Sequence, residues 1–207
     1  HNFPLLIKNL SWLSLQSFFF VIFLLLNNNF QNAIVFNNFL IVDFFSTFIK
    51  LIVICLNSVL LLIVLGYNRK EKLNNFEFVI LNIFSCIGIF FLVSSYDLIS
   101  VFLALELQSF SFYILCCFKR YSEFSVEAGL KYFILGAFSS GFFLFGCSFL
   151  YGFSGTTNFE KLFVFFNSFS SEFFSSNFIC FTSLFFIFIG LMFKLGLAPF
   201  HIWGDRK

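Results

Sequence analysis

Six apolar stretches, each close to the length of a membrane-spanning helix, dominate this chain. A span needs about 20 mostly apolar residues. The stretches cover residues 10–26, 39–66, 76–95, 98–118, 129–151 and 178–198. Backbone groups in lipid must find hydrogen-bond partners within their own segment, so the stretches are expected to be helices. The sequence therefore predicts an all-α fold, a polytopic transmembrane helical bundle of about six spans. The last span is expected to break near Pro199, because proline removes a backbone donor.

Composition supports a membrane environment and excludes several classes of protein. Only 11% of the residues are charged and 60% are hydrophobic, whereas soluble domains carry about 25% charged residues. The 42 phenylalanines among 207 residues favour an A/T-rich, organelle-like genome over selection for packing. The six cysteines lie in apolar runs without a CxxC or Cys/His cluster, so neither a metal site nor a disulfide framework is expected. No basic tract indicates a nucleic-acid partner.

The basic residues predict the orientation of the bundle. Under the positive-inside rule, one side of the membrane collects most lysines and arginines of the connections. Lys161 alone falls on the other side. Both chain ends are then expected in one compartment, the matrix if the organelle is a mitochondrion. The basic residues of that side are Lys8, Arg69, Lys70, Lys72, Lys119, Arg120, Arg206 and Lys207.

The connections between the stretches differ in character. Residues 27–38 form an uncharged, asparagine-rich loop, and residues 152–177 are expected to lie at the surface with a short amphipathic piece near 159–166. The first apolar run lacks an A-x-A-like cleavage site, so it is interpreted as a span rather than a signal peptide. Small residues in the fifth stretch are expected to permit close helix contact. They are Gly136, Ala137, Ser140, Gly141 and Gly146.

Two charges lie deep inside predicted spans, where insertion costs at least ~2.5–3.5 kcal/mol. Glu106 is in mid-helix, with Ser109 and Tyr113 on its face at i+3 and i+7. It is either a carboxyl that takes and gives protons or a structural glutamate bonded to a neighbouring helix. Lys194 precedes Gly196 and Pro199. It is either a proton relay beside a broken helix or a lysine that extends to the nearer interface.

Four further ionisable residues are open to two interpretations. Lys131 begins the fifth span and is favoured to reach the interface. Asp43 and Lys50 share one face of the second span, two turns apart, and Lys50 has no obvious partner. His201 is able to carry protons near neutral pH, but a histidine at the interface is more often simply solvated.

Four segments, in order, resemble a known family. They are Asp97–Leu115, Phe118–Gly141, Tyr151–Phe159 and Phe193–Trp203. Together they resemble subunit 2 of the NADH dehydrogenase of respiratory complex I, a family of antiporter-like membrane subunits. The resemblance implies that Glu106 and Lys194 form an ion pair across neighbouring helices, which the pumping cycle makes and breaks. It also implies that Lys131 joins the polar axis that carries protons along the membrane arm.

The resemblance sets the expected organisation and partners. Residues 1–38 would be a first span and loop without signature, and residues 39–207 an antiporter-like half-module with one repeat. The family continues past Trp203 with more spans, so a split gene with a second polypeptide, or a truncated chain, is expected. The other partners would be complex I membrane-arm subunits and lipid, in the mitochondrial inner membrane.

The expected function is proton translocation coupled to NADH:ubiquinone oxidoreduction in the respiratory chain, as one subunit of a translocase and not as an isolated catalyst. No nucleotide, flavin or iron–sulfur motif occurs in the sequence, so electron transport and its cofactors are expected in other subunits. Two alternatives remain open. One is a cation/proton antiporter subunit, and the other is a structural half-subunit that has lost pumping.

Overall fold

The computed structural model describes residues 4–27, 33–70, 76–119, 121–167 and 174–197. Within these ranges the chain forms seven helices and one short hairpin, and six of the helices are long and apolar enough to cross a membrane. The helical bundle and its six spans are thus confirmed. The spans are α1 (Pro4–Leu26), α2 (Phe44–Lys70), α3 (Glu77–Ser94), α4 (Leu98–Cys116), α5 (Glu123–Ser154) and α7 (Phe174–Leu195). The short helix α6 (Phe159–Asn167) matches the amphipathic piece expected there.

A β-hairpin occupies the connection between α1 and α2, and the sequence did not predict it. Strands β1 (Ala33–Val35) and β2 (Leu40–Val42) pair antiparallel. The turn residues Phe36, Asn37 and Asn38 have positive φ, at 55°, 51° and 70°, a conformation that asparagine tolerates. The second helix therefore begins at Phe44, not at residue 39 as expected. Its first turn is set by Asp43 and Ser46, since the Asp43 N–H donates to Ser46 Oγ at 3.0 Å.

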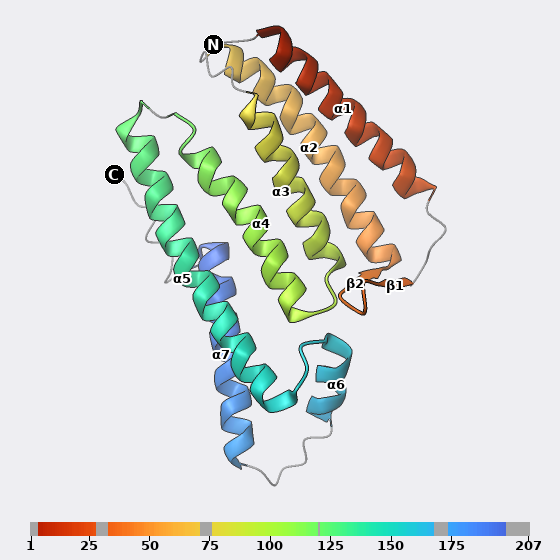
Figure 1. Ribbon diagram of the computed structural model, residues 1–207, viewed down its shortest axis with the longest axis vertical. Helices are drawn as coiled ribbons and strands as arrows, with labels where there is room; N and C mark the ends of the chain where they lie inside the picture. Colours follow the sequence, from red (N-terminus) through yellow and green to blue (C-terminus); the bar gives the residue numbers. More distant parts are fainter. Residues whose placement is uncertain (1–3, 28–32, 71–75, 120, 168–173, 198–207) are drawn as a thin grey trace.

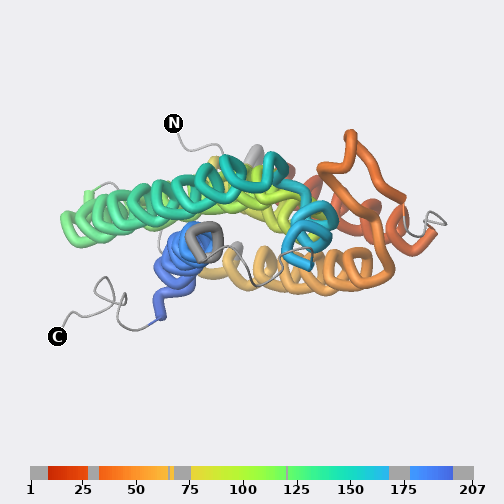
Figure 2. The backbone as a smooth tube through the Cα atoms, turned by 90° about the horizontal axis from the view of Figure 1, so that it is seen from below, coloured from red at the N-terminus to blue at the C-terminus, as the bar shows by residue number. Residues whose placement is uncertain are grey.

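The spans are arranged in two layers. Helices α1 to α4 follow one another side by side, and α5 continues from α4 and packs along α7 (Figure 1). The hairpin, the α3–α4 connection and α6 lie at one end of the bundle, whereas α4 ends and α5 begins at the other (Figure 1). In the view at 90° to Figure 1, α2 and α7 lie on one side of the layer that contains α3, α4 and α5 (Figure 2). Helix α4 contacts α3 on one side and α5 on the other.

Small residues let neighbouring helices touch through their backbones. A Cβ atom added at Gly146 of α5 would lie 2.7 Å from the Ser183 carbonyl oxygen of α7, and one at Gly190 of α7 would lie 2.9 Å from the Ser139 carbonyl oxygen. In contrast, Gly141 faces open space. Close backbone approach is how membrane helices gain packing energy without a hydrophobic driving force. The small residues thus allow α5 and α7 to pack closely along the segment between Ser139 and Gly146.

Hydrogen bonds between three connections hold the hairpin end of the bundle together. The Thr157 hydroxyl donates to Asp97 Oδ2 at 2.9 Å, while Asp97 Oδ1 accepts the Ile99 N–H at 3.0 Å and caps α4. Asn158 Nδ2 donates to the main-chain carbonyls of Asn38 and Tyr96, at 3.2 and 3.4 Å. These bonds fix the start of α4, the helix that carries Glu106.

The same cluster includes a tyrosine with an altered acidity. Burial and the hydrogen bond to Glu160 raise the pKa of Tyr96 above its ordinary value. Its main chain accepts the Phe159 N–H and donates to the Phe39 carbonyl. Tyr96 thus joins the hairpin, the α3–α4 connection and the start of α6.

The close α5–α7 contact predicts that alanine is destabilising at Gly146 but not at Gly141 of the same helix. Gly146→Ala puts a methyl group against the α7 backbone, and overpacking of this kind typically costs ~1–3 kcal/mol. Gly141→Ala is the matched control, because its methyl group meets open space and alanine is the better helix former by ~0.5–1 kcal/mol. Thermal unfolding of the protein in detergent, followed by circular dichroism, is expected to show a lower midpoint for Gly146→Ala only. Equal midpoints would contradict the close contact.

Candidate functional site

An ion pair joins two spans that are far apart in the sequence. Lys194 Nζ of α7 lies 3.0 Å from Glu106 Oε1 of α4, and the two side chains are only 15% and 17% exposed. Charges removed from water in this way each carry a desolvation cost of several kcal/mol, which their mutual attraction offsets. The two deep charges that the sequence singled out therefore meet in the fold. The pair is a place where one protonation change alters a strong electrostatic interaction.

Local backbone geometry explains where Lys194 sits. Gly196 has φ 63°, its N–H donates to the Phe193 carbonyl, and the Leu197 N–H donates to the Met192 carbonyl, both at 3.2 Å. This is a Schellman end, which needs a residue with positive φ directly after the helix. Lys194 therefore occupies the last turn of α7, where the helix dipole favours a cation. The expected break at Pro199 and the position of His201 lie outside the described residues.

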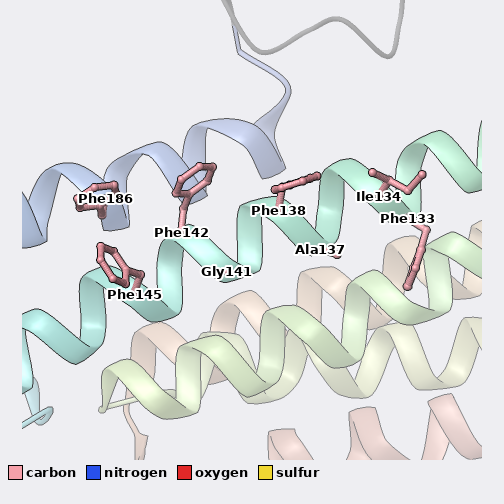
Figure 3. Close-up of a pocket in the computed structure, with 8 residues that line it drawn as sticks. All are labelled: Phe133, Ile134, Ala137, Phe138, Gly141, Phe142, Phe145 and Phe186. Carbon is pink, nitrogen blue, oxygen red and sulfur yellow. The ribbon is translucent and has the colours of Figure 1, made fainter.

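One flank of the pair is apolar. Phe193, next to Lys194, stacks on Phe142 of α5 with ring centroids 6.2 Å apart, and Phe142 also stacks on Phe186 of α7 at 6.2 Å. Phe142 and Phe186 also line an open groove along α5 and α7, which Figure 3 shows. Its eight lining residues carry no polar side chain; they are Phe133, Ile134, Ala137, Phe138, Gly141, Phe142, Phe145 and Phe186. The groove itself therefore has no ionisable or hydroxyl side chain among its lining residues.

Lys131 stands apart from this pair. Its Nζ lies 2.8 Å from Glu127 Oε1, one turn earlier on α5, and both side chains are about half exposed, at 55% and 47%. An exposed pair of this spacing contributes only ~0.3–0.5 kcal/mol. The fold thus brings together Glu106 and Lys194, and it places Lys131 on an outer surface of α5.

Other polar residues are arranged for structure. Asp43 precedes α2 and bonds to Ser46, and Lys50 is half-buried on that helix. Within the described ranges, no three His, Cys, Asp or Glu side chains gather in a way that could hold a metal ion. The hydrogen bonds of Asp97 with Thr157 and of Asn158 with Asn38 were not predicted, because they join residues about 60 and 120 positions apart. The D-x-x-S pattern at Asp97 and Ser100, a capping box, could have indicated that Asp97 begins α4.

These features define a class: a polytopic helical membrane protein with a carboxylate–ammonium pair between two of its spans. The chain belongs to the NADH:quinone oxidoreductase/Mrp antiporter transmembrane family, whose family model matches residues 95–205, more than half of the chain. The matched region begins at the α3–α4 connection and includes both members of the Glu106–Lys194 pair.

Individual relatives agree with this assignment. The chain is 42% identical to NADH-ubiquinone oxidoreductase chain 2 of Marchantia polymorpha, over 99% of this chain and 42% of that protein. It is 38% identical to NADH-quinone oxidoreductase subunit N of Paramagnetospirillum magneticum, over 82% of this chain and 35% of that protein. The chain thus spans about two fifths of the length of the curated relatives it matches.

Solved structures share the fold. A chain of respiratory complex I from Thermus thermophilus with bound aureothin superposes with a TM-score of 0.74 at 26% identity, covering 95% of this chain and 41% of that one. A chain of the membrane-bound sulfane sulfur reductase, an archaeal respiratory membrane complex, gives 0.70 at 20% identity, covering 93% and 39%. The second likeness concerns the fold alone.

The buried ion pair predicts that replacing Glu106 lowers the stability of the protein more than replacing Glu127. Glu106→Gln keeps the side-chain shape but leaves the Lys194 ammonium without its counter-ion, which for a buried pair destabilises by up to about 3–5 kcal/mol. Glu127→Gln, in the exposed pair, is expected to cost below ~1 kcal/mol. Thermal unfolding in detergent measures both. The double variant Glu106→Gln/Lys194→Met removes both charges and is expected to recover most of the loss. A double variant no more stable than Glu106→Gln would argue against the pair.

Proposed function

We propose that this chain is a membrane-arm subunit of respiratory complex I, of the chain 2 or subunit N type, that takes part in proton translocation coupled to NADH:ubiquinone oxidoreduction. The observation that carries the proposal is the Glu106–Lys194 pair at 3.0 Å, inside the region that matches the family model. The names of the relatives support the membership in the complex. The redox reaction and its cofactors (nicotinamide, flavin, iron–sulfur clusters and quinone) belong to other subunits, so the chain is not catalytic in isolation.

The pair provides a way to load and release a proton. While Glu106 is ionised and close, Lys194 is held as an ammonium by Coulomb attraction, which is strong at low dielectric. If a conformational change separates the two, the ammonium becomes an unpaired charge out of water and tends to give up its proton. One proton leaves, and a neutral amine remains. When the pair reforms, the amine regains a proton, so a cycle of opening and closing moves one proton per turn.

Two further residues of the expected proton path extend this proposal. Lys131, exposed on α5 beside Glu127, would continue the polar axis from the outer surface of this helix. His201 would be a second proton carrier after the end of α7. Residues 39–207 would act as the antiporter-like half-module, although the expected boundary after residue 38 falls within the turn of the hairpin.

The setting of the chain follows from the same proposal. The names of the relatives support the other membrane-arm subunits of the complex as partners, with lipid around the spans. The plant relatives support the mitochondrial inner membrane. The six spans found among the described residues are an even number, and together with the basic connections they support both ends on the matrix side.

Replacing the glutamate in the assembled complex tests the function. Glu106→Gln is expected to reduce NADH-driven proton uptake by at least ~10²-fold, the lower range for loss of a positioned proton-transfer group. Proton uptake and NADH oxidation are measured together in membrane vesicles. Glu123→Gln, an exposed glutamate at the start of α5, is the control and is expected to behave as wild type. Unchanged proton uptake in Glu106→Gln would refute the pumping role.

Membership in the complex has its own measurement. The native membranes are solubilised gently, a native gel is stained for NADH oxidation, and the stained band is searched for peptides of this chain. The proposal requires the chain there, together with other membrane-arm subunits of the complex. A chain that runs elsewhere without NADH activity would favour the cation/proton antiporter alternative, which the family description also includes.

A further inference from the structure

We propose that the hydroxyl groups of Ser109 and Tyr113 form a proton relay between Glu106 and the end of the bundle where α4 ends and α5 begins. The inference rests on the proposed function and adds two residues and a direction to it. Ser109 and Tyr113 follow Glu106 on one face of α4, and they are buried, with 8% and 7% exposure. Buried hydroxyls in line with an ionisable group are the parts from which a side-chain proton path is built.

The two hydroxyl-bearing side chains follow the glutamate on one face of the helix. Ser109 Oγ donates to the Glu106 main-chain carbonyl at 3.0 Å, and Tyr113 comes four residues after Ser109, one turn further along α4. In the relay, the Tyr113 hydroxyl donates to Ser109 Oγ. A rotation of the Ser109 hydroxyl from the carbonyl toward the carboxylate would complete the path.

The phenol ring of Tyr113 is held in place from several sides. It packs edge-on against Tyr132 and Phe133 of α5, with centroids 4.8 and 5.6 Å away, and against Phe110 at 6.1 Å. Its hydroxyl occupies the place that a Cβ atom at Gly136 would take, so only glycine fits at that position of α5. A ring fixed this firmly keeps its hydroxyl at one point, as a relay requires.

The surroundings of Glu106 differ in the two directions along α4. Toward the hairpin end, Leu98, Val101 and Phe102 belong to an apolar cluster with Phe143 and Leu150 of α5. Toward the other end come Ser109, Tyr113 and then the half-buried Tyr132. Beyond them, the Ser125 hydroxyl donates to the Cys116 carbonyl at 2.7 Å. An apolar plug on one side and hydroxyls on the other indicate that protons reach Glu106 from the α4–α5 end.

The transfer balances as a chain of hydroxyl exchanges. A proton that arrives at the Tyr113 oxygen is matched by the proton that Tyr113 passes to Ser109 Oγ. Ser109 in turn passes its own proton to the Glu106 carboxylate. The net change is one carboxylate protonated and both hydroxyls restored. No covalent bond other than O–H forms or breaks, and no oxidant or reductant is needed.

The test removes single hydroxyls in the assembled complex. Tyr113→Phe keeps the ring and its edge-on contacts, and Tyr121→Phe, at a fully exposed tyrosine of the α4–α5 connection, is the matched control. NADH-driven proton uptake is expected to fall at least ~10-fold in Tyr113→Phe and to stay at the wild-type rate in Tyr121→Phe. A positioned proton-transfer group contributes roughly 10²–10⁴-fold, and a water molecule can replace part of it. Ser109→Ala is expected to show the same loss, and Ser109→Thr, which keeps a hydroxyl, to retain uptake.

A second readout separates a relay from a packing role. The relay predicts that proton transfer becomes rate-limiting in Tyr113→Phe, so the solvent deuterium isotope effect on coupled NADH oxidation rises. A packing defect lowers the amount of complex on a native gel and leaves the isotope effect as it was. Wild-type uptake in Tyr113→Phe and Ser109→Ala, with loss in Glu106→Gln, would overturn the relay alone. Wild-type uptake in all three would overturn the proposed function as well. If Tyr113→Phe does not assemble, the Ser109→Ala and Ser109→Thr comparison decides.

Discussion

The ion pair between Glu106 and Lys194 is the constraint on which the rest of this bundle depends. A carboxylate or an ammonium out of water costs several kcal/mol unless an opposite charge lies beside it. The two side chains are separated by 88 positions in sequence and come from α4 and α7, which both pack against α5. The fold must therefore hold α4 and α7 at a separation that lets Lys194 Nζ reach Glu106 Oε1, at 3.0 Å.

Close backbone contact in α5 is how the separation is achieved. Gly146 and Gly190 allow α7 to lie directly on α5, and Gly136 allows Tyr113 of α4 to reach the α5 backbone. A larger residue at any of these positions would move α4 or α7 outward and lengthen the 3.0 Å ion pair. The hydrogen bonds of Asp97, Thr157 and Asn158 then prevent α4 from sliding along its axis, because they hold its first turn to two other connections.

The site is asymmetric in three directions. The outer face of α5 and α7 is lined by phenylalanines, and the hairpin side of Glu106 is closed by Leu98, Val101 and Phe102. Along α4, the buried hydroxyls of Ser109 and Tyr113 continue from Glu106 toward the α4–α5 connection. A pump needs such asymmetry, because a proton that could approach the carboxylate equally from both sides would leak back down its gradient. Lys131 lies on a different surface of α5, so its connection to the pair requires groups beyond those that contact it here.

The sequence by itself determined the membrane class, the six spans and the two deep charges. Each of these is a local property, since a run of about 20 apolar residues or a charge within it needs no tertiary contact to be recognised. The start of α2 depends on local structure that hydropathy does not reveal. Residues 40–42 form a strand of the hairpin, so the helix begins at Phe44 and not at residue 39. Hydropathy and spacing found Glu106 and Lys194 one by one, but only the tertiary structure brings these residues, 88 positions apart, to 3.0 Å. It also decided that Gly136 faces a hydroxyl and Gly141 open space. The physical reason is that helix rotation and separation come from packing between segments, which hydropathy and spacing do not encode.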